Sequence, residues 1–97
     1  MDWKTLSTYE IKIYSTPWCS DCRRLKQKFQ DQNITFTEID IDSNPEAADY
    51  LVKKTGHRAI PYIEINEQWI VRGWHKEIPN RWDDQIFFSE VENSVQG

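Results

Sequence analysis

The two cysteines of this 97-residue chain, Cys19 and Cys22, are separated by only two residues. An alternating apolar run over 11–14 precedes them and a helical pattern over 23–32 follows, so the pair lies where a strand leads into a helix. A helix N-terminus carries unpaired N–H groups and the positive end of the helix dipole, and both favour a thiolate. Cys-X-X-Cys pairs so placed have thiol pKa values of about 3.5–7.5. The spacing therefore predicts a redox-active dithiol, with Cys19 as the more exposed attacking sulfur and Cys22 as the shielded resolving one.

The residues around the pair act on a thiolate in opposite directions. Asp21 lies between the cysteines, and its charge opposes ionisation of a neighbouring thiol. Arg23, Arg24 and the helix dipole favour ionisation. We expect the favourable effects to dominate.

Metal binding and structural cross-linking are the competing interpretations of the pair. A zinc site would need two more ligands, and only His57 and His75 are available, at a spacing that fits none of the common patterns. A structural disulfide is disfavoured because closing a two-residue loop gives little entropic stabilisation. No metal site is predicted within the chain.

Composition limits the classes of protein to which the chain can belong. A net charge of −4 argues against general nucleic-acid binding, which needs clustered cations. No apolar run approaches the length of a membrane span, and residues 1–4 lack the pattern of a signal peptide. We expect a single domain over residues 1–97 with a cytoplasmic location, where a close cysteine pair serves redox or metal chemistry.

Periodicity and capping residues predict an α/β fold. Residues 1–9 have no clear period and are treated as a short arm. Strands are predicted at 10–15, 35–42, 61–65 and 68–72, and helices at 23–32, from the capping sequence 43–46 to Thr55, and at 80–95. A strand, a helix and a second strand in succession imply that the first two strands are parallel, and the later hairpin adds two antiparallel strands. The expected architecture has three layers: a four-stranded mixed sheet with helices on both faces.

The motif and the element order together resemble the thioredoxin superfamily and, within it, the glutaredoxin branch, with mycoredoxins as the nearest likeness. Three segments carry the resemblance, Ile13–Cys19 (IYSTPWC), Cys22–Lys26 (CRRLK) and His57–Pro61 (HRAIP). It implies a thioredoxin-like fold and thiol–disulfide oxidoreductase activity. It also implies a cis Ile60–Pro61 peptide beside the active-site cysteine.

The resemblance also implies which residues contact substrate, and the sequence departs from the family at some of them. The positions carried over are Thr16, Trp18, Arg58, Ala59, Ile60, Pro61, Gly73 and Trp74. Thr16 stands where many glutathione-dependent members have lysine. Gly73-Trp74 replaces a Gly-Gly followed by polar or acidic residues that cradles the γ-glutamyl end of glutathione. These departures favour a different small thiol or a protein disulfide as substrate.

The predicted function is reduction of protein or mixed disulfides by a monomer that binds no cofactor tightly, no nucleic acid and no membrane. The co-substrate is glutathione, mycothiol or bacillithiol. One alternative is a dedicated electron donor, reduced by a thioredoxin reductase and serving a ribonucleotide reductase or peroxidase, with Trp74 and Trp82 as docking surface. A second is an iron–sulfur cluster bridged between two copies, as the resemblance allows. Trp69 is expected to be half-buried hairpin packing.

Overall fold

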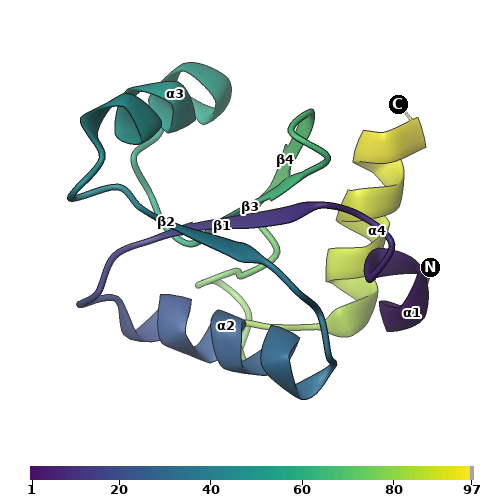
Figure 1. Ribbon diagram of the computed structural model, residues 1–97. Coiled ribbons are helices and arrows are strands. Elements are labelled where there is room, and N and C mark those ends of the chain that lie inside the picture. The colour runs from purple at the N-terminus through teal and green to yellow at the C-terminus, as the bar shows by residue number, and fades with distance from the viewer. Residues whose placement is uncertain (97) are drawn as a thin grey trace.

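The computed structural model describes residues 1–96 and contains one mixed sheet between layers of helices (Figure 1). Its elements are α1 (Trp3–Leu6), β1 (Ile11–Ser15), α2 (Ser20–Asp31), β2 (Thr37–Asp40), α3 (Pro45–Thr55), β3 (Tyr62–Ile65), β4 (Trp69–Val71) and α4 (Asp84–Gln96). The strand order is β2-β1-β3-β4, with β1 parallel to β2 and the other pairs antiparallel. This is the three-layer α/β architecture that the sequence predicts.

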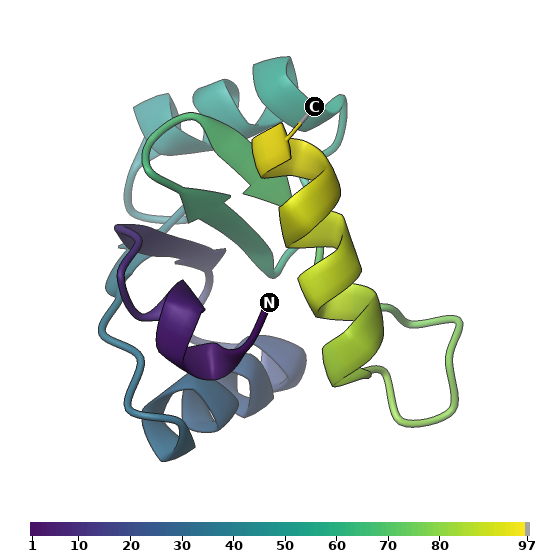
Figure 2. The same cartoon turned by 90° about the vertical axis from the view of Figure 1, so that its right-hand side faces the viewer.

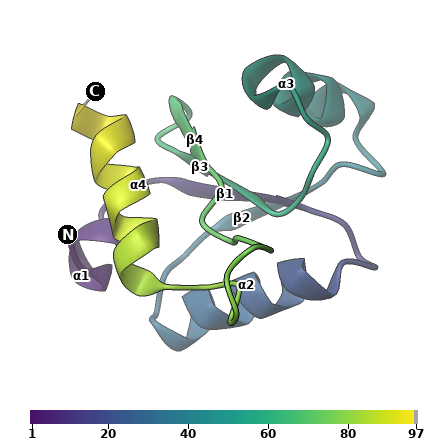
Figure 3. The same ribbon diagram turned by 180° about the vertical axis from the view of Figure 1, so that it is seen from behind.

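The two faces of the sheet bury different clusters because successive strand residues point to opposite sides. One face carries Ile11, Ile13 and Ile63 against side chains of α1, α2 and α4. The other carries Tyr14 against Ala48 and Leu51 of α3. Seen from behind, α3 stands alone on its side of the sheet, with α2 on the opposite side (Figure 3). Among residues 1–96, no helix is long and apolar enough to cross a membrane.

The N-terminal residues form a packed helical turn rather than the unassigned arm of the sequence analysis. Leu6 is fully buried, and the Trp3 ring stacks on Trp82 with 6.2 Å between ring centroids. The Met1 ammonium lies 2.5 Å from the carboxylate of Glu92 in α4. Figure 2 shows α1 next to the lower half of α4. A single turn anchored by two side chains is too short to produce a detectable period, which is why the sequence did not predict it.

Element boundaries follow the local capping residues. Gly56 ends α3 with φ of 79°, and Asn33 follows α2 with φ of 59°, so the backbone of both is left-handed. α2 begins at Ser20, three residues earlier than predicted, because Cys19 itself caps the helix. α4 begins at Asp84 rather than 80, where the carboxylate of Asp83 accepts backbone N–H groups of the first turn. The strands β2, β3 and β4 are each shorter than predicted.

Candidate active site

Cys19 occupies the N-cap position of α2. Its backbone is extended, with φ of −83° and ψ of 111°, and its Sγ accepts a hydrogen bond from the backbone N–H of Cys22 at 3.1 Å. N-cap positions usually hold a side-chain oxygen that accepts this N–H. A sulfur in that place lies at the positive end of the helix dipole. The arrangement stabilises a thiolate more than a thiol because an ionised acceptor makes the stronger hydrogen bond.

The two sulfurs have unequal surroundings. Cys19 is 8% exposed and Cys22 is completely buried, which agrees with the predicted order of exposure. Both are free thiols. Burial, followed by the hydrogen bond with Cys19, raises the pKa of the Cys22 thiol. Cys22 is therefore a protonated, shielded group, whereas Cys19 borders a cavity of about 480 Å³.

Two arginines neutralise the carboxylate that lies between the cysteines. The side chain of Asp21 is 7% exposed; its Oδ1 lies 2.9 Å from Arg24 and its Oδ2 lies 2.6 Å from Arg81. Arg23, which the sequence analysis assigned to this compensation, instead donates to the carbonyl of Pro17 at 3.0 Å. Arg81 was missed because it is 60 residues from Asp21 in the chain and no local pattern links the two.

The thiol cavity brings together several of the predicted substrate residues. Trp18, Arg58, Ala59 and Ile60 line it together with Cys19. Trp18 is 70% exposed, and its indole Nε1 donates to the carboxylate of Asp42 at 2.7 Å. That same carboxylate lies 3.9 Å from Arg58. Asp42 thus links two residues of the cavity rim.

A second cavity, of about 370 Å³, adjoins the first on the side of Pro61. The Ile60–Pro61 peptide is cis, as the resemblance implied. Pro61 and Trp74, two of the predicted substrate residues, line this second cavity. Ala59, Ile60 and the unpredicted Lys76 border both cavities, so these three residues form a shared wall.

Two predicted substrate residues are buried outside both cavities. Thr16 is 1% exposed, and its carbonyl accepts the backbone N–H of Cys19 at 3.3 Å. Gly73 has φ of 68°, and a Cβ added there would lie 2.8 Å from Ile63 Cδ1 and 3.1 Å from Phe87 Cδ1. The absence of a side chain at Gly73 is thus explained by packing between the sheet and α4. Contact of Thr16 or Gly73 with a substrate stays a prediction.

The tryptophans in the last third of the chain are packed against other side chains rather than exposed. Trp74 is 6% exposed, and its ring centroid lies 5.7 Å from that of the half-buried Trp82. Both belong to the larger core cluster, and Trp69 is half-buried in the β4 hairpin as predicted. A docking surface made of Trp74 and Trp82 is therefore wrong. The exposed indole beside the thiol is Trp18.

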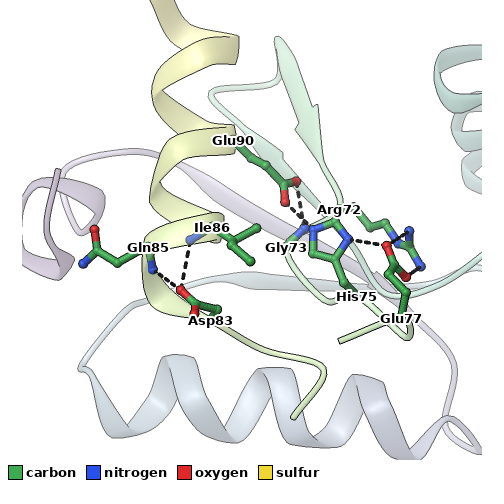
Figure 4. Close-up of polar contacts among 8 residues, drawn as sticks. All are labelled: Arg72, Gly73, His75, Glu77, Asp83, Gln85, Ile86 and Glu90. Atoms are coloured by element: carbon green, nitrogen blue, oxygen red, sulfur yellow. Dashed lines mark hydrogen bonds and ion pairs between the residues drawn. The ribbon is translucent and has the colours of Figure 1, made fainter. Parts of the chain in front are cut away.

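The loop over 72–83, between β4 and α4, is held by polar contacts (Figure 4). The carboxylate of Glu90 accepts the backbone N–H of Gly73 at 3.3 Å and contacts the His75 ring at Nε2. The other ring nitrogen lies 3.2 Å from Glu77, whose two oxygens each lie 3.1 Å from the guanidinium of Arg72. Among residues 1–96, no three His, Cys, Asp or Glu side chains are grouped so as to hold a metal ion.

The chain matches one protein-family model and several characterised proteins. The glutaredoxin family model matches residues 11–70. The chain is 40% identical over 57 residues to a glutaredoxin of Pseudomonas aeruginosa, covering 59% of this chain and 68% of that protein. It is 30% identical over 76 residues to the Gene 56 protein of Mycobacterium phage L5, covering 78% of this chain and 71% of that protein.

Solved structures resemble the chain in fold. The glutaredoxin from Archaeoglobus fulgidus superposes with a TM-score of 0.61 at 14% identity, covering 100% of this chain and 97% of that one. A buckwheat glutaredoxin–glutathione complex superposes with a TM-score of 0.53 at 21% identity, covering 65% of this chain and 60% of that one. The thioredoxin-like fold predicted from the sequence is thereby confirmed.

Proposed function

The chain belongs to the glutaredoxin family of thiol–disulfide oxidoreductases, and from that premise we propose that it is a mycoredoxin-like dithiol enzyme that reduces mixed disulfides through Cys19 and Cys22. The observation that carries the proposal is the N-cap geometry: the sulfur of Cys19 accepts the N–H of Cys22 at 3.1 Å and borders an open cavity. In the proposal, residues 1–97 form one functional unit, because α1 and α4 share the core cluster with the family-matched segment.

The proposed reaction begins at the less buried of the two sulfurs, that of Cys19. The Cys19 thiolate attacks one sulfur of the substrate disulfide, the substrate S–S bond breaks, and the leaving thiolate departs with the electron pair. Cys22 then loses its proton and attacks Cys19 Sγ, which releases the second substrate thiol and leaves a Cys19–Cys22 disulfide. The substrate gains two electrons and the protein loses two. The raised pKa of Cys22 keeps this thiol protonated until the mixed disulfide has formed.

The rim residues position the substrate in this proposal. Ala59 and Ile60 border both cavities, so their main chain is placed to align a disulfide that spans the two. Arg58 and the exposed indole of Trp18 line the cavity that contains Cys19. Trp74 lines the cavity beside Pro61.

The family's co-substrate is glutathione, and the buckwheat relative is described as a complex with it. For this chain we propose a different small thiol, with mycothiol and bacillithiol as the candidates. The reason is local: Trp74, with its buried indole, follows Gly73 at the edge of the cavity beside Pro61. A large side chain there reduces the space for close approach of a ligand to the backbone.

A second candidate function is electron donation to one protein partner, with regeneration by a thioredoxin reductase. The exposure of Trp18, at 70%, favours it, because tryptophans beside a reactive group are frequent anchors of protein interfaces. In this case Cys22 would be needed in every cycle, since the partner's own disulfide supplies no external resolving thiol.

The substitution Cys22→Ser separates the two candidates. A mixed-disulfide reductase keeps much of its activity, because a free small thiol resolves the Cys19 adduct. A protein electron donor loses nearly all turnover. Oxidised wild-type protein is then offered in parallel to glutathione, mycothiol, bacillithiol and a thioredoxin reductase, with the free thiols counted at intervals. Failure of Cys19 to form any adduct with a disulfide would refute the proposed function itself.

A further inference from the structure

Lys76 stands at the junction of the two cavities beside the reactive sulfur. It lines the 480 Å³ cavity with Cys19 and the 370 Å³ cavity with Pro61. Both volumes are in the range of small-ligand sites. A disulfide held across the wall of Ala59 and Ile60 would place one half in each cavity, with the ammonium of Lys76 reaching either half.

The arginines near the two cavities each have a carboxylate partner, which leaves the ammonium of Lys76 available to bind an anion. Arg81 is engaged by the buried Asp21, and Arg72 by Glu77. Arg58 has the carboxylate of Asp42 at 3.9 Å. Lys76 is exposed and has no ion pair within residues 1–96. The lining therefore contains more unsatisfied positive than negative charge, although the whole chain has a net charge of −4.

The contacts on either side of Lys76 limit where its backbone can lie. His75, before it, contacts Glu90 of α4 and donates its backbone N–H to the carbonyl of Arg81 at 2.8 Å. Glu77, after it, is held by Arg72 (Figure 4). A cation on a preorganised backbone loses less entropy on binding an anion than one on a free loop.

We propose that Lys76 makes the enzyme selective for small disulfides whose halves carry carboxylates and selective against those whose halves carry ammonium groups. The inference rests on the proposed function, since it concerns the same reactive sulfur, and of the two candidate thiols it favours bacillithiol, which carries carboxylates, over mycothiol, which carries none. As the S–S bond of an anionic disulfide breaks, the departing thiolate adds negative charge beside Lys76, so the lysine favours binding and bond cleavage together.

The test uses three aliphatic disulfides that differ in charge: dithiodipropionate, which is dianionic, hydroxyethyl disulfide, which is neutral, and cystamine, which is dicationic. Reduced full-length protein is mixed with each, and the second-order rate constant of Cys19 oxidation is followed by acid quench and mass spectrometry. The comparison is the variant-to-wild-type ratio for each disulfide, which removes differences in intrinsic reactivity. Lys53→Ala, an exposed lysine of α3 that lines neither the thiol cavity nor the one beside Pro61, is the matched control.

Because stabilisation of the departing thiolate is common to all three disulfides, the neutral one is the reference. Relative to hydroxyethyl disulfide, Lys76→Ala is expected to lower the rate constant for dithiodipropionate about two- to fivefold, as for one exposed charge pair, and to raise that for cystamine. Lys76→Glu changes the charge by two units instead of one, so the fold-change in each rate constant is expected to be the square of that caused by Lys76→Ala. Added salt should reduce the wild-type preference. Equal losses with all three disulfides, or an equal effect of Lys53→Ala, would overturn the inference and leave the proposed function standing. If wild-type protein reacts with none of the three, the proposed function fails.

Discussion

Besides residues 58–60, the thiol cavity has two walls of different origin. One is the motif segment 16–22, of which residues 18–21 line the cavity and all lie inside the region matched by the glutaredoxin family. The other is the loop over 72–83, which lies beyond that region. The motif segment supplies the sulfurs and the helix N-terminus, whereas the loop supplies charge and packing, through Arg81, Lys76 and Trp74. The reaction thus depends on local backbone geometry, and its electrostatic setting depends on a distant segment.

The largest expected effect concerns the motif wall alone. At pH 7, iodoacetamide should modify Cys19 at least about a hundredfold faster than Cys22, because Cys22 is buried and its raised pKa keeps it protonated. Peptide mapping of timed samples measures the two rates. Raising the pH to 9 should leave Cys22 unmodified, since its pKa lies higher still, whereas unfolding in urea should make the two rates similar. Comparable labelling of both thiols in the native protein would contradict the division of roles.

The next effect concerns the loop wall and its packing. Gly73→Ala should destabilise the protein by about 2–3 kcal/mol, because the new Cβ would lie 2.8 Å from Ile63 Cδ1 at a left-handed backbone position. Gly56→Ala is the matched control. It has a similar φ of 79° but no atom within 4 Å of the added Cβ, so about 1 kcal/mol of backbone strain is expected alone. Urea unfolding followed by tryptophan fluorescence measures both. Equal losses would mean that packing against α4 does not fix the loop.

The motif wall was the more predictable of the two because its signals are local. A strand period, the cysteine spacing and a capping position all lie within residues 11–22, so the position of Cys19 at a helix N-terminus followed from the sequence. The left-handed Gly56 was also predictable, since a helix pattern ends directly before it. The cis Ile60–Pro61 peptide needed the resemblance to a family, because most X–Pro peptides are trans.

The loop wall could not be predicted because its structure depends on residues far apart in the sequence. Arg81 contacts Asp21 across 60 residues, and neither position has a local pattern that requires the other. Trp74 looked like an exposed ring beside the site, but its ring packs next to Trp82, which in turn packs on Trp3 and Phe87. Packing of this kind is a property of the assembled core, which a short sequence window does not contain.

The α3 face of the sheet lies outside both walls. A substitution there is expected to change the stability of the protein without changing the reactivity of Cys19. On the α3 face, the carboxylate of Glu64 is 2% exposed and accepts hydrogen bonds from Tyr14, at 3.0 Å, and from Tyr50. The hydrogen bond to Glu64, followed by burial, raises the pKa of Tyr50 to about 12. Because the folded pKa exceeds that of the unfolded chain, this contribution to stability is complete below pH 10 and is lost as the pH rises toward 12.

Tyr50→Phe should therefore lower the free energy of unfolding by about 1 kcal/mol below pH 9. Above pH 10 the variant should lose stability less steeply than the wild type, because it lacks one of the perturbed phenols. Urea titrations at several pH values measure both slopes. The alkylation rate of Cys19 should not change, and a change would show that reactivity is not confined to the two walls.

The smallest effect tests whether the two walls act on each other. Arg81→Gln removes one of the two cations that neutralise Asp21, so the carboxylate beside the motif should oppose the Cys19 thiolate more strongly. Because the Arg81 side chain is 46% exposed, screening limits the expected fall in alkylation rate at pH 7 to about two- to fivefold. Added salt should reduce this fall, which would not happen if a change in packing alone caused it.

The same measurement is then made with Arg81→Gln in a protein that also carries Asp21→Asn. If Arg81 acts through the carboxylate, Arg81→Gln should have no effect on the alkylation rate once Asp21 is neutral, so the two substitutions are not additive. Arg23→Gln is a matched control, because Arg23 is bonded to the Pro17 carbonyl and not to Asp21. An undiminished effect of Arg81→Gln in the Asp21→Asn protein would mean that the arginine acts on the sulfur directly. The loop would then be part of the thiolate's own environment, and the division between a reactive wall and a supporting wall would no longer hold.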